Sequence, residues 1–178
     1  MSEYKILITG TMGAGKTTAI AAVSDIAPVT TEVPNNDASC DKALTTVGMD
    51  YGELALPSGE RLRLYGTPGQ ERFQFMWKIL AQGALGLIIL VDNSRPDPLA
   101  DLEMYLTNFS TLIRERGCVV AVGRCDSHPT PTVDAFAARM AEQGLLCPVV
   151  EADARSREDI LNVLDLLILQ LETRVYAS

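Results

Sequence analysis

The amino-acid sequence predicts an α/β fold in which a mostly parallel β-sheet, with one antiparallel hairpin strand, carries helices on both faces. Three observations support this fold class. Apolar segments of strand length alternate along the chain with segments of helical period. Residues 85–91 are almost all apolar, which is typical of a central strand covered on both sides. Residues 51–56 and 61–65 are separated only by a Pro-Ser-Gly-Glu turn and therefore predict a hairpin.

The N-terminal elements follow from local patterns. Residues 6–9 form a short apolar run that ends at Gly10, and residues 17–26 have helical spacing that stops before Pro28. Residues 28–45 are polar and contain Pro and Asn, so we expect a loop there. A loop of this length in a compact domain favours a functional role over a plain connection.

The C-terminal half continues the alternation of strand and helix. Helices are expected where apolar residues recur at spacings of three and four, and strands where short apolar runs lie between them. Gly144 suits the position just after a helix, and the acidic residues that follow Ser156 suit the first turn of another. The predicted elements are strands at residues 118–122 and 146–150 and helices at residues 99–116, 132–143 and 156–171.

Length and charge limit the possible functions. The 178 residues suffice for a single domain with a sizeable core, and 47% of them are hydrophobic. The formal net charge is −8, from 15 basic and 23 acidic residues. An acidic chain repels a phosphate backbone, so nucleic acid is not an expected partner.

Targeting and redox signals point to a cytoplasmic protein without a membrane anchor. The four cysteines, Cys40, Cys118, Cys125 and Cys147, show no CxxC spacing, so neither a zinc site nor a redox motif is expected. The longest apolar run is far shorter than the ~20 residues of a membrane helix. The N-terminus lacks a signal-peptide pattern, and the C-terminus lacks the cysteine that prenylation requires.

A glycine-rich loop follows the first predicted strand and opens the first predicted helix. Residues 10–17 read G-T-M-G-A-G-K-T and fit the phosphate-loop pattern GxxxxGK(S/T) in full. Glycines let successive backbone N–H groups point at phosphate, the lysine adds a positive charge, and the threonine hydroxyl is a Mg²⁺ ligand. The expected phosphate-binding residues are Gly10, Met12, Gly13, Ala14, Gly15, Lys16, Thr17 and Thr18. The motif predicts the three-layer fold of P-loop NTPases but does not distinguish ATP from GTP.

Four further segments resemble the motifs of Ras and Rab GTPases. Residues 66–73, G-T-P-G-Q-E-R-F, resemble D-T-A-G-Q-E-R-F, and residues 46–50, T-V-G-M-D, resemble T-I-G-V-D. Residues 123–126, G-R-C-D, stand where the family has N-K-x-D, and residues 153–155, D-A-R, stand where it has S-A-K. The chain as a whole looks like a prokaryotic Ras-like small GTPase, similar to the gliding-motility polarity and conservon GTPases.

The resemblance implies roles around the phosphates. Gln70 would orient the attacking water, and Gly69 would donate its backbone N–H to the γ-phosphate. Thr17 and Thr46 would bind Mg²⁺, with the adjacent Thr45 as an alternative to Thr46.

The resemblance also implies a guanine site. The carboxylate of Asp126 would accept from guanine N1–H and N2–H₂, a contact that adenine cannot satisfy. Arg124 would lie over the purine face, and Ala154 would donate a backbone N–H to guanine O6. Arg155 completes the expected guanine-binding residues.

Three positions depart from the family pattern. Gly66 lacks the aspartate that holds Mg²⁺ through water, and Asp92 is either a replacement carboxylate or a cap of the turn that follows its strand. Gly123 lacks the asparagine of the base-reading motif, so part of the guanine recognition is lost. Met12 crowds the space that an inserted arginine finger uses, so we expect slow hydrolysis.

Together these features predict a GTP/GDP-binding switch that hydrolyses GTP slowly and controls binding to protein partners. Residues 1–178 would form one G domain, with an extended switch I at residues 28–46 and a switch II at residues 66–77. Phe73, Phe75 and Trp77 fit either a partner surface or the core. An effector, an activator and a roadblock/longin-type regulator are the expected partners. Two alternatives are a non-hydrolysing nucleotide-binding scaffold and an ATP-dependent phosphotransferase.

Overall fold

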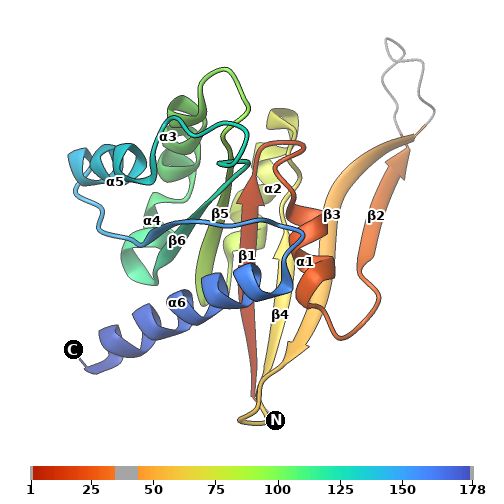
Figure 1. The fold of residues 1–178 in the computed structure, drawn as a ribbon. Helices are drawn as coiled ribbons and strands as arrows, with labels where there is room; N and C mark the ends of the chain where they lie inside the picture. The colour runs from red at the N-terminus through yellow and green to blue at the C-terminus, as the bar shows by residue number, and fades with distance from the viewer. Residues whose placement is uncertain (1, 35–43, 177–178) are drawn as a thin grey trace.

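The computed structural model describes residues 2–34 and 44–176, and for residues 31–34 and 44–48 it describes the backbone alone. A seven-stranded sheet forms the centre of the described chain, in the order β2-β3-β4-β1-β5-β6-β7 (Figure 1). Among these strands, β3 alone runs opposite to the other six, so its pairings with β2 and β4 are antiparallel and the rest are parallel. The strands are β1 (Glu3–Gly10), β2 (Val29–Pro34), β3 (Leu44–Ala55), β4 (Arg61–Gly66), β5 (Gly86–Asp92), β6 (Cys118–Gly123) and β7 (Val149–Glu151). The predicted fold class is confirmed.

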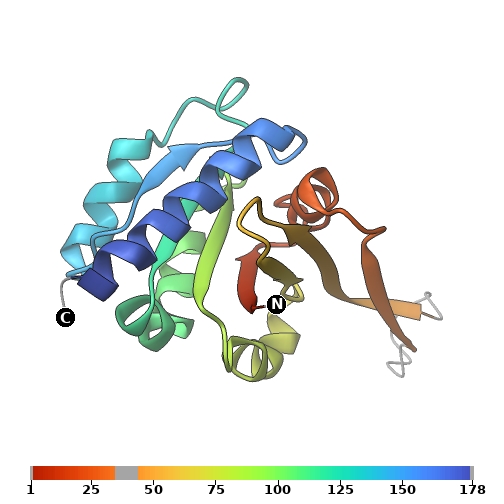
Figure 2. The ribbon, with the colours of Figure 1, turned by 90° about the horizontal axis from the view of Figure 1, so that it is seen from below.

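Helices cover both faces of the sheet (Figure 2). On β1, Ile6 and Ile8 pack with α1 and α6, while Leu7 packs on the opposite face with α2, α3, α4 and α5. This division follows from the two-residue repeat of a strand, which sends alternate side chains to opposite faces. The helices are α1 (Lys16–Val23), α2 (Gln74–Ala81) after the 3₁₀ turn η1 (Glu71–Phe73), α3 (Pro98–Asn108), α4 (Ser110–Glu115), α5 (Val133–Glu142) and α6 (Arg157–Tyr176).

The central strand β5 is buried along all seven of its residues, as its apolar run predicts. The predicted hairpin is also confirmed, since β3 and β4 pair from Ala55 opposite Arg61 to Asp50 opposite Gly66. Within the described residues, each helix is too short or too polar to cross a lipid bilayer.

The predicted loop at residues 28–45 is wrong in part, because Val29–Pro34 forms strand β2 and β3 begins at Leu44. Strand β2 lies at the edge of the sheet, where it pairs with β3 alone and the register shifts between Thr31 and Val33. An edge strand needs no continuous apolar pattern, so its polar sequence resembles a loop. Residues 35–43 lie outside the described part of the chain.

The single helix predicted at residues 99–116 is two helices, α3 and α4, that meet at Phe109. Phe109 has φ −110° and ψ 18°, which ends α3, and its side chain is buried. Its ring stacks on the indole of Trp77 with centroids 5.6 Å apart. Tertiary packing of an aromatic ring therefore overrides a continuous helical pattern here. The other large boundary differences are that β1 begins at Glu3, α1 ends at Val23, β7 begins at Val149 and α6 extends to Tyr176.

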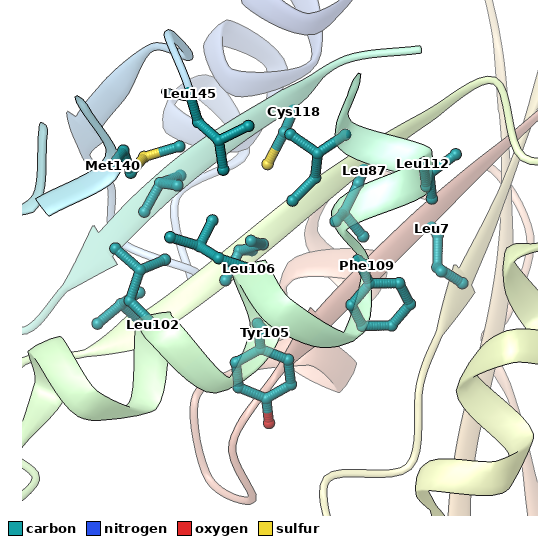
Figure 3. Packing of buried hydrophobic residues seen from close by; sticks show 14 of the residues in the cluster. Leu7, Leu87, Leu102, Tyr105, Leu106, Phe109, Leu112, Cys118, Met140 and Leu145 are labelled. Atoms are coloured by element: carbon teal, nitrogen blue, oxygen red, sulfur yellow. The ribbon is translucent and has the colours of Figure 1, made fainter. Parts of the chain in front are cut away.

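Aromatic packing anchors the segment that follows β4. The side chain of Trp77 is 1% exposed and its ring lies 5.0 Å from that of Tyr105. Its indole Nε1–H donates to the Pro68 carbonyl at 2.9 Å. Figure 3 shows the side chains of Tyr105 and Phe109 on this face of the sheet, in the same cluster as Leu7 and Leu87. Trp77 is thus a core residue, whereas Phe75, on the same helix, is 65% exposed.

Replacing Trp77 by alanine is expected to lower the free energy of unfolding by about 3–5 kcal/mol, because it leaves a large cavity and an unpaired Pro68 carbonyl. Phe75→Ala is the matched control on the same helix, and we expect it to change the free energy by less than about 0.5 kcal/mol. Urea denaturation of the two variants measures both values. Equal losses would contradict the division of this helix into a buried and an exposed face.

Candidate functional site

A cleft of about 1290 Å³ opens where the loops after β1, β4, β6 and β7 come together. In parallel sheets ligands bind at this edge, beyond the carboxyl ends of the strands. Gly10 is buried beneath the cleft, and the side chain of Thr46 lies outside the described part of the chain, as does that of Thr45. The other predicted site residues all line the cleft: Met12, Gly13, Ala14, Gly15, Lys16, Thr17, Thr18, Gly69, Gln70, Arg124, Asp126, Ala154 and Arg155.

The phosphate loop packs tightly against the loop that follows β7. Gly15 has φ 102°, a left-handed conformation, and α1 begins at the next residue. A Cβ atom at Gly15 would lie 2.8 Å from the Cβ of Ala154. Glycine at this position therefore lets the phosphate loop and the predicted guanine loop approach each other closely.

Lys16 lies under the loop as a buried cation. Its ammonium group donates to the carbonyl oxygens of Gly10 at 2.6 Å and Thr11 at 2.8 Å. Burial lowers the pKa of Lys16 from 10.5 to about 8, and the nearby carboxylate of Asp50 opposes part of that shift. A buried ammonium group bonded only to neutral carbonyls is a site that an anion stabilises.

Asp50 also lines the cleft, and no role was predicted for it from the sequence. The residue is 2% exposed, and its carboxylate accepts from the Thr17 hydroxyl at 2.7 Å and from the Thr30 hydroxyl at 2.9 Å. A Cβ atom at Gly66 would lie 3.2 Å from the Cβ of Asp50. The carboxylate thus reaches Thr17 from the strand next to Gly66 and fills the space that a side chain at position 66 would need.

Hairpin register was the signal that could have found Asp50. The turn at residues 57–60 places Ala55 opposite Arg61, and counting five residues back along β3 and forward along β4 places Asp50 opposite Gly66. Directly opposed residues share one face of a sheet. Because position 66 has no acid, the residue directly opposite it, Asp50, is the acid expected nearest to that position.

Asp92 lies elsewhere in the site. It accepts from the backbone N–H of Ser94 at 2.9 Å and from the Ser94 hydroxyl at 2.6 Å, which fits its interpretation as a turn cap. It also pairs with Arg124 at 3.0 Å. The structure brings Asp50, not Asp92, into contact with Thr17.

At the other end of the cleft lie the predicted base-binding residues. Arg124 has φ 64°, and its guanidinium Nη2 donates to the Gly13 carbonyl at 3.1 Å. Asp126 is exposed in the cleft, and among the described residues none donates a hydrogen bond to its carboxylate. Arg155 pairs with Asp153 at 2.8 Å, and its side-chain and backbone hydrogen bonds lower the pKa of that carboxyl to about 2.

The predicted switch II residues lie against the phosphate loop. A Cβ atom at Gly69 would lie 2.7 Å from the backbone nitrogen of Met12 and 2.9 Å from the ammonium of Lys16, so a side chain is excluded there. The Gln70 amide nitrogen lies 3.9 Å from the Met12 sulfur. The Gln70 amide oxygen accepts from Arg72 Nε at 2.7 Å.

Burial of the Lys16 charge predicts a pH-dependent stability without nucleotide. Because its pKa is about 8 in the folded state and near 10.5 when unfolded, the unfolded chain binds the proton more tightly. The penalty is fully present below pH 8, is relieved as the pH rises towards 10.5, and amounts to about 3 kcal/mol. We therefore expect Lys16→Met to be more stable than the wild type at pH 7, by a margin that shrinks as the pH rises. Urea denaturation at a series of pH values measures this margin, and a constant margin would contradict a buried ammonium group.

Comparison with known proteins identifies relatives on two levels. The family described as "conserved hypothetical ATP binding protein" matches residues 31–178, a range that begins after the phosphate loop. The Ras-related protein Rab-3 of Caenorhabditis elegans is 24% identical over 169 residues, which cover 93% of this chain and 72% of that protein. The Ras-related protein RabC of Dictyostelium discoideum is 23% identical over 182 residues, covering 98% and 87%. The Ras-related protein Rab-3D of Homo sapiens is 23% identical over 169 residues, covering 93% and 72%. The chain therefore belongs to the family described as "conserved hypothetical ATP binding protein" and is a distant homologue of the Ras-related Rab proteins.

Proposed function

We propose that this chain is a Mg²⁺-dependent GTP-binding switch of the Ras-like kind, with slow GTP hydrolysis. The observation that carries the proposal is the convergence of Lys16, Asp126 and Gln70 on one cleft, from three loops far apart in the sequence. Distant homology to Ras-related Rab proteins supports it.

The phosphate loop would bind the α- and β-phosphates through its backbone N–H groups at the start of α1. Lys16 would exchange neutral partners for a phosphate oxygen, which raises its pKa and keeps it protonated at neutral pH. A Cβ atom at Gly69 would lie 2.9 Å from the Lys16 ammonium, so the Gly69 N–H would be near a terminal phosphate bound by Lys16.

Thr17 and Asp50 supply the hard oxygen donors that suit Mg²⁺. The ion would neutralise phosphate charge when it is bound. Thr17 would be a direct ligand, and the buried Asp50 would fix the Thr17 hydroxyl or a coordinated water, as second-layer carboxylates do in other metal sites. Thr46 remains the proposed ligand from switch I.

Asp126 would determine the specificity for guanine over adenine. Its carboxylate accepts from the two donors of a guanine edge, whereas adenine leaves it unsatisfied. Two observations make adenine the competing base: position 123 has no side chain for base recognition, and the family description names ATP. Competition of GDP and ADP for the cleft separates the two bases, and we expect GDP to win at least tenfold.

The contacts of Gln70 support slow hydrolysis. Met12 is 65% exposed beside the Gln70 amide, and Arg72 holds the amide oxygen. Gln70 would have to leave both partners to orient a water molecule, and Met12 would crowd an arginine inserted by an activator. Reorganisation of residues 28–46 and 66–77 would then transmit the nucleotide state. The proposed partners are cytoplasmic proteins, including a roadblock/longin-type regulator.

A non-hydrolysing nucleotide-binding scaffold is the second candidate. It is favoured by the same contacts of Gln70 and by the glycines at positions 66 and 123. The two candidates make opposite statements about Gln70, so one experiment decides between them.

Asp50→Asn is expected to remove most of the effect of Mg²⁺ on GDP affinity, about 10–100-fold, because the amide keeps the shape but loses the charge. The matched control is Glu53→Gln. Glu53 lies on the opposite face of the same strand, paired with Arg61 at 2.8 Å, and its loss should leave the effect of Mg²⁺ unchanged. Titration of GDP with and without Mg²⁺ measures the change, and circular dichroism of the unloaded variants controls for folding. Retention of the full Mg²⁺ effect in Asp50→Asn would rule out the proposed role.

Single-turnover hydrolysis of bound GTP tests Gln70. The switch predicts a slow rate in the wild type that falls about 10²-fold in Gln70→Ala, since orientation of the attacking water is lost. Glu71→Ala, at the adjacent residue, serves as the control and should keep the wild-type rate. Equal, background rates in the wild type and in Gln70→Ala would favour the scaffold.

A further inference from the structure

Position 123, at the end of β6, carries no side chain toward the cleft that it lines. Gly123 ends β6, and a Cβ atom there would lie 3.6 Å from the carbonyl oxygens of both Val91 and Ala152. These are ordinary contact distances, so a side chain would fit. The glycine is therefore not required by lack of space, and nothing at this position links the base end of the cleft to the phosphate loop.

Arg124 makes that link from the next residue. Its Nη2 donates to the Gly13 carbonyl of the phosphate loop, while its Nε pairs with Asp92 Oδ1 at 3.0 Å. Arg124 makes both contacts with its backbone in the left-handed region, at φ 64°. It is the one non-glycine residue with a positive φ within the described part of the protein.

Asp92 is held firmly enough to act as an anchor. Its side chain is 8% exposed, whereas that of Arg124 is 54% exposed, so the carboxylate is the fixed member of the pair. The backbone N–H and hydroxyl of Ser94 donate to the same carboxylate oxygen. The neighbouring Asn93 amide donates to the carbonyls of His128 at 2.6 Å and Pro131 at 3.0 Å. The turn after β5 thus holds the base loop, residues 124–132 between β6 and α5, at two points.

We infer that Asp92 is a positioning residue for nucleotide binding, and that Asp92, Arg124 and the Gly13 carbonyl form an ionic strap that replaces a side chain at position 123. The strap would hold the base loop and the phosphate loop at the spacing that a nucleotide bridges, and would slow nucleotide release. This inference rests on the proposed function, since it names how the same cleft retains its nucleotide.

Charge and burial explain why this pair matters more than an ordinary surface ion pair. Exposed pairs contribute about 0–1 kcal/mol, because water screens both charges and two flexible chains must be ordered. Asp92 is already buried and oriented by Ser94, so its side chain loses little further conformational entropy when it pairs with Arg124. Without the charge on Asp92, the Arg124 guanidinium would lose the ion pair that orients it toward the Gly13 carbonyl and toward the proposed purine position.

The test is the release rate of a fluorescent GDP analogue in the presence of Mg²⁺. Asp92→Asn keeps an acceptor for Ser94 but removes the charge, and we expect release to be about tenfold faster, with an unchanged melting temperature without nucleotide. Glu103→Gln is the matched control, because it removes one acid from the Arg139–Glu103 pair between α3 and α5 and should leave release unchanged. Gly123→Asn added to Asp92→Asn should restore slow release, since its Cβ would make only ordinary contacts and its amide could supply the missing link.

Three outcomes would overturn the strap: an unchanged release rate in Asp92→Asn, faster release with an equally lowered melting temperature, or failure of Gly123→Asn to slow release again. Should Asp92→Asn not fold, Arg124→Gln removes the same pair from its exposed end and carries the same expectation. Wild-type protein that binds no GDP analogue would instead overturn the proposed function, and the strap with it.

Discussion

The buried ammonium group of Lys16 is the interaction on which the cleft depends. It is held by two neutral carbonyl oxygens of its own loop, with the buried carboxylate of Asp50 on strand β3 nearby, and burial brings its pKa to about 8. Such an arrangement is costly until an anion arrives, so phosphate binding and the conformation of the loop are coupled. The glycines at positions 15 and 69 serve this coupling, because they bring two other loops within contact distance of the same cradle.

In the proposed function, neighbours in space offset two departures from the family pattern. The acid missing at position 66 has a counterpart at Asp50, directly opposite in the β3–β4 ladder. The side chain missing at position 123 has a counterpart in Arg124 and Asp92, which lie at the ends of adjacent strands β6 and β5. In both places a glycine lies close to a buried acid, and the proposed function gives that acid a role at the cleft.

Local patterns predicted much of this structure. The fold class follows from alternation of strand and helix, and the phosphate loop from eight consecutive residues. What failed was non-local. Strand β2 is polar because it lies at the sheet edge, and the break at Phe109 exists because its ring packs on Trp77, thirty-two residues away. Asp50 escaped notice because its role depends on strand register and not on its neighbours in sequence. Arg124 was expected over the purine face, but its partners come from the end of strand β5 (Asp92) and from the phosphate loop (Gly13) and could not be predicted from spacing.

The central claim is that residues 10–17 form an anion cradle that serves a guanine nucleotide. Equilibrium binding of labelled GDP to the wild type and to Lys16→Ala, with unlabelled ADP as competitor, tests it most directly. We predict tight binding to the wild type, at least a hundredfold weaker binding to Lys16→Ala, and poor competition by ADP. Absence of GDP binding by the wild type, or equal affinity in the two proteins, would contradict the account.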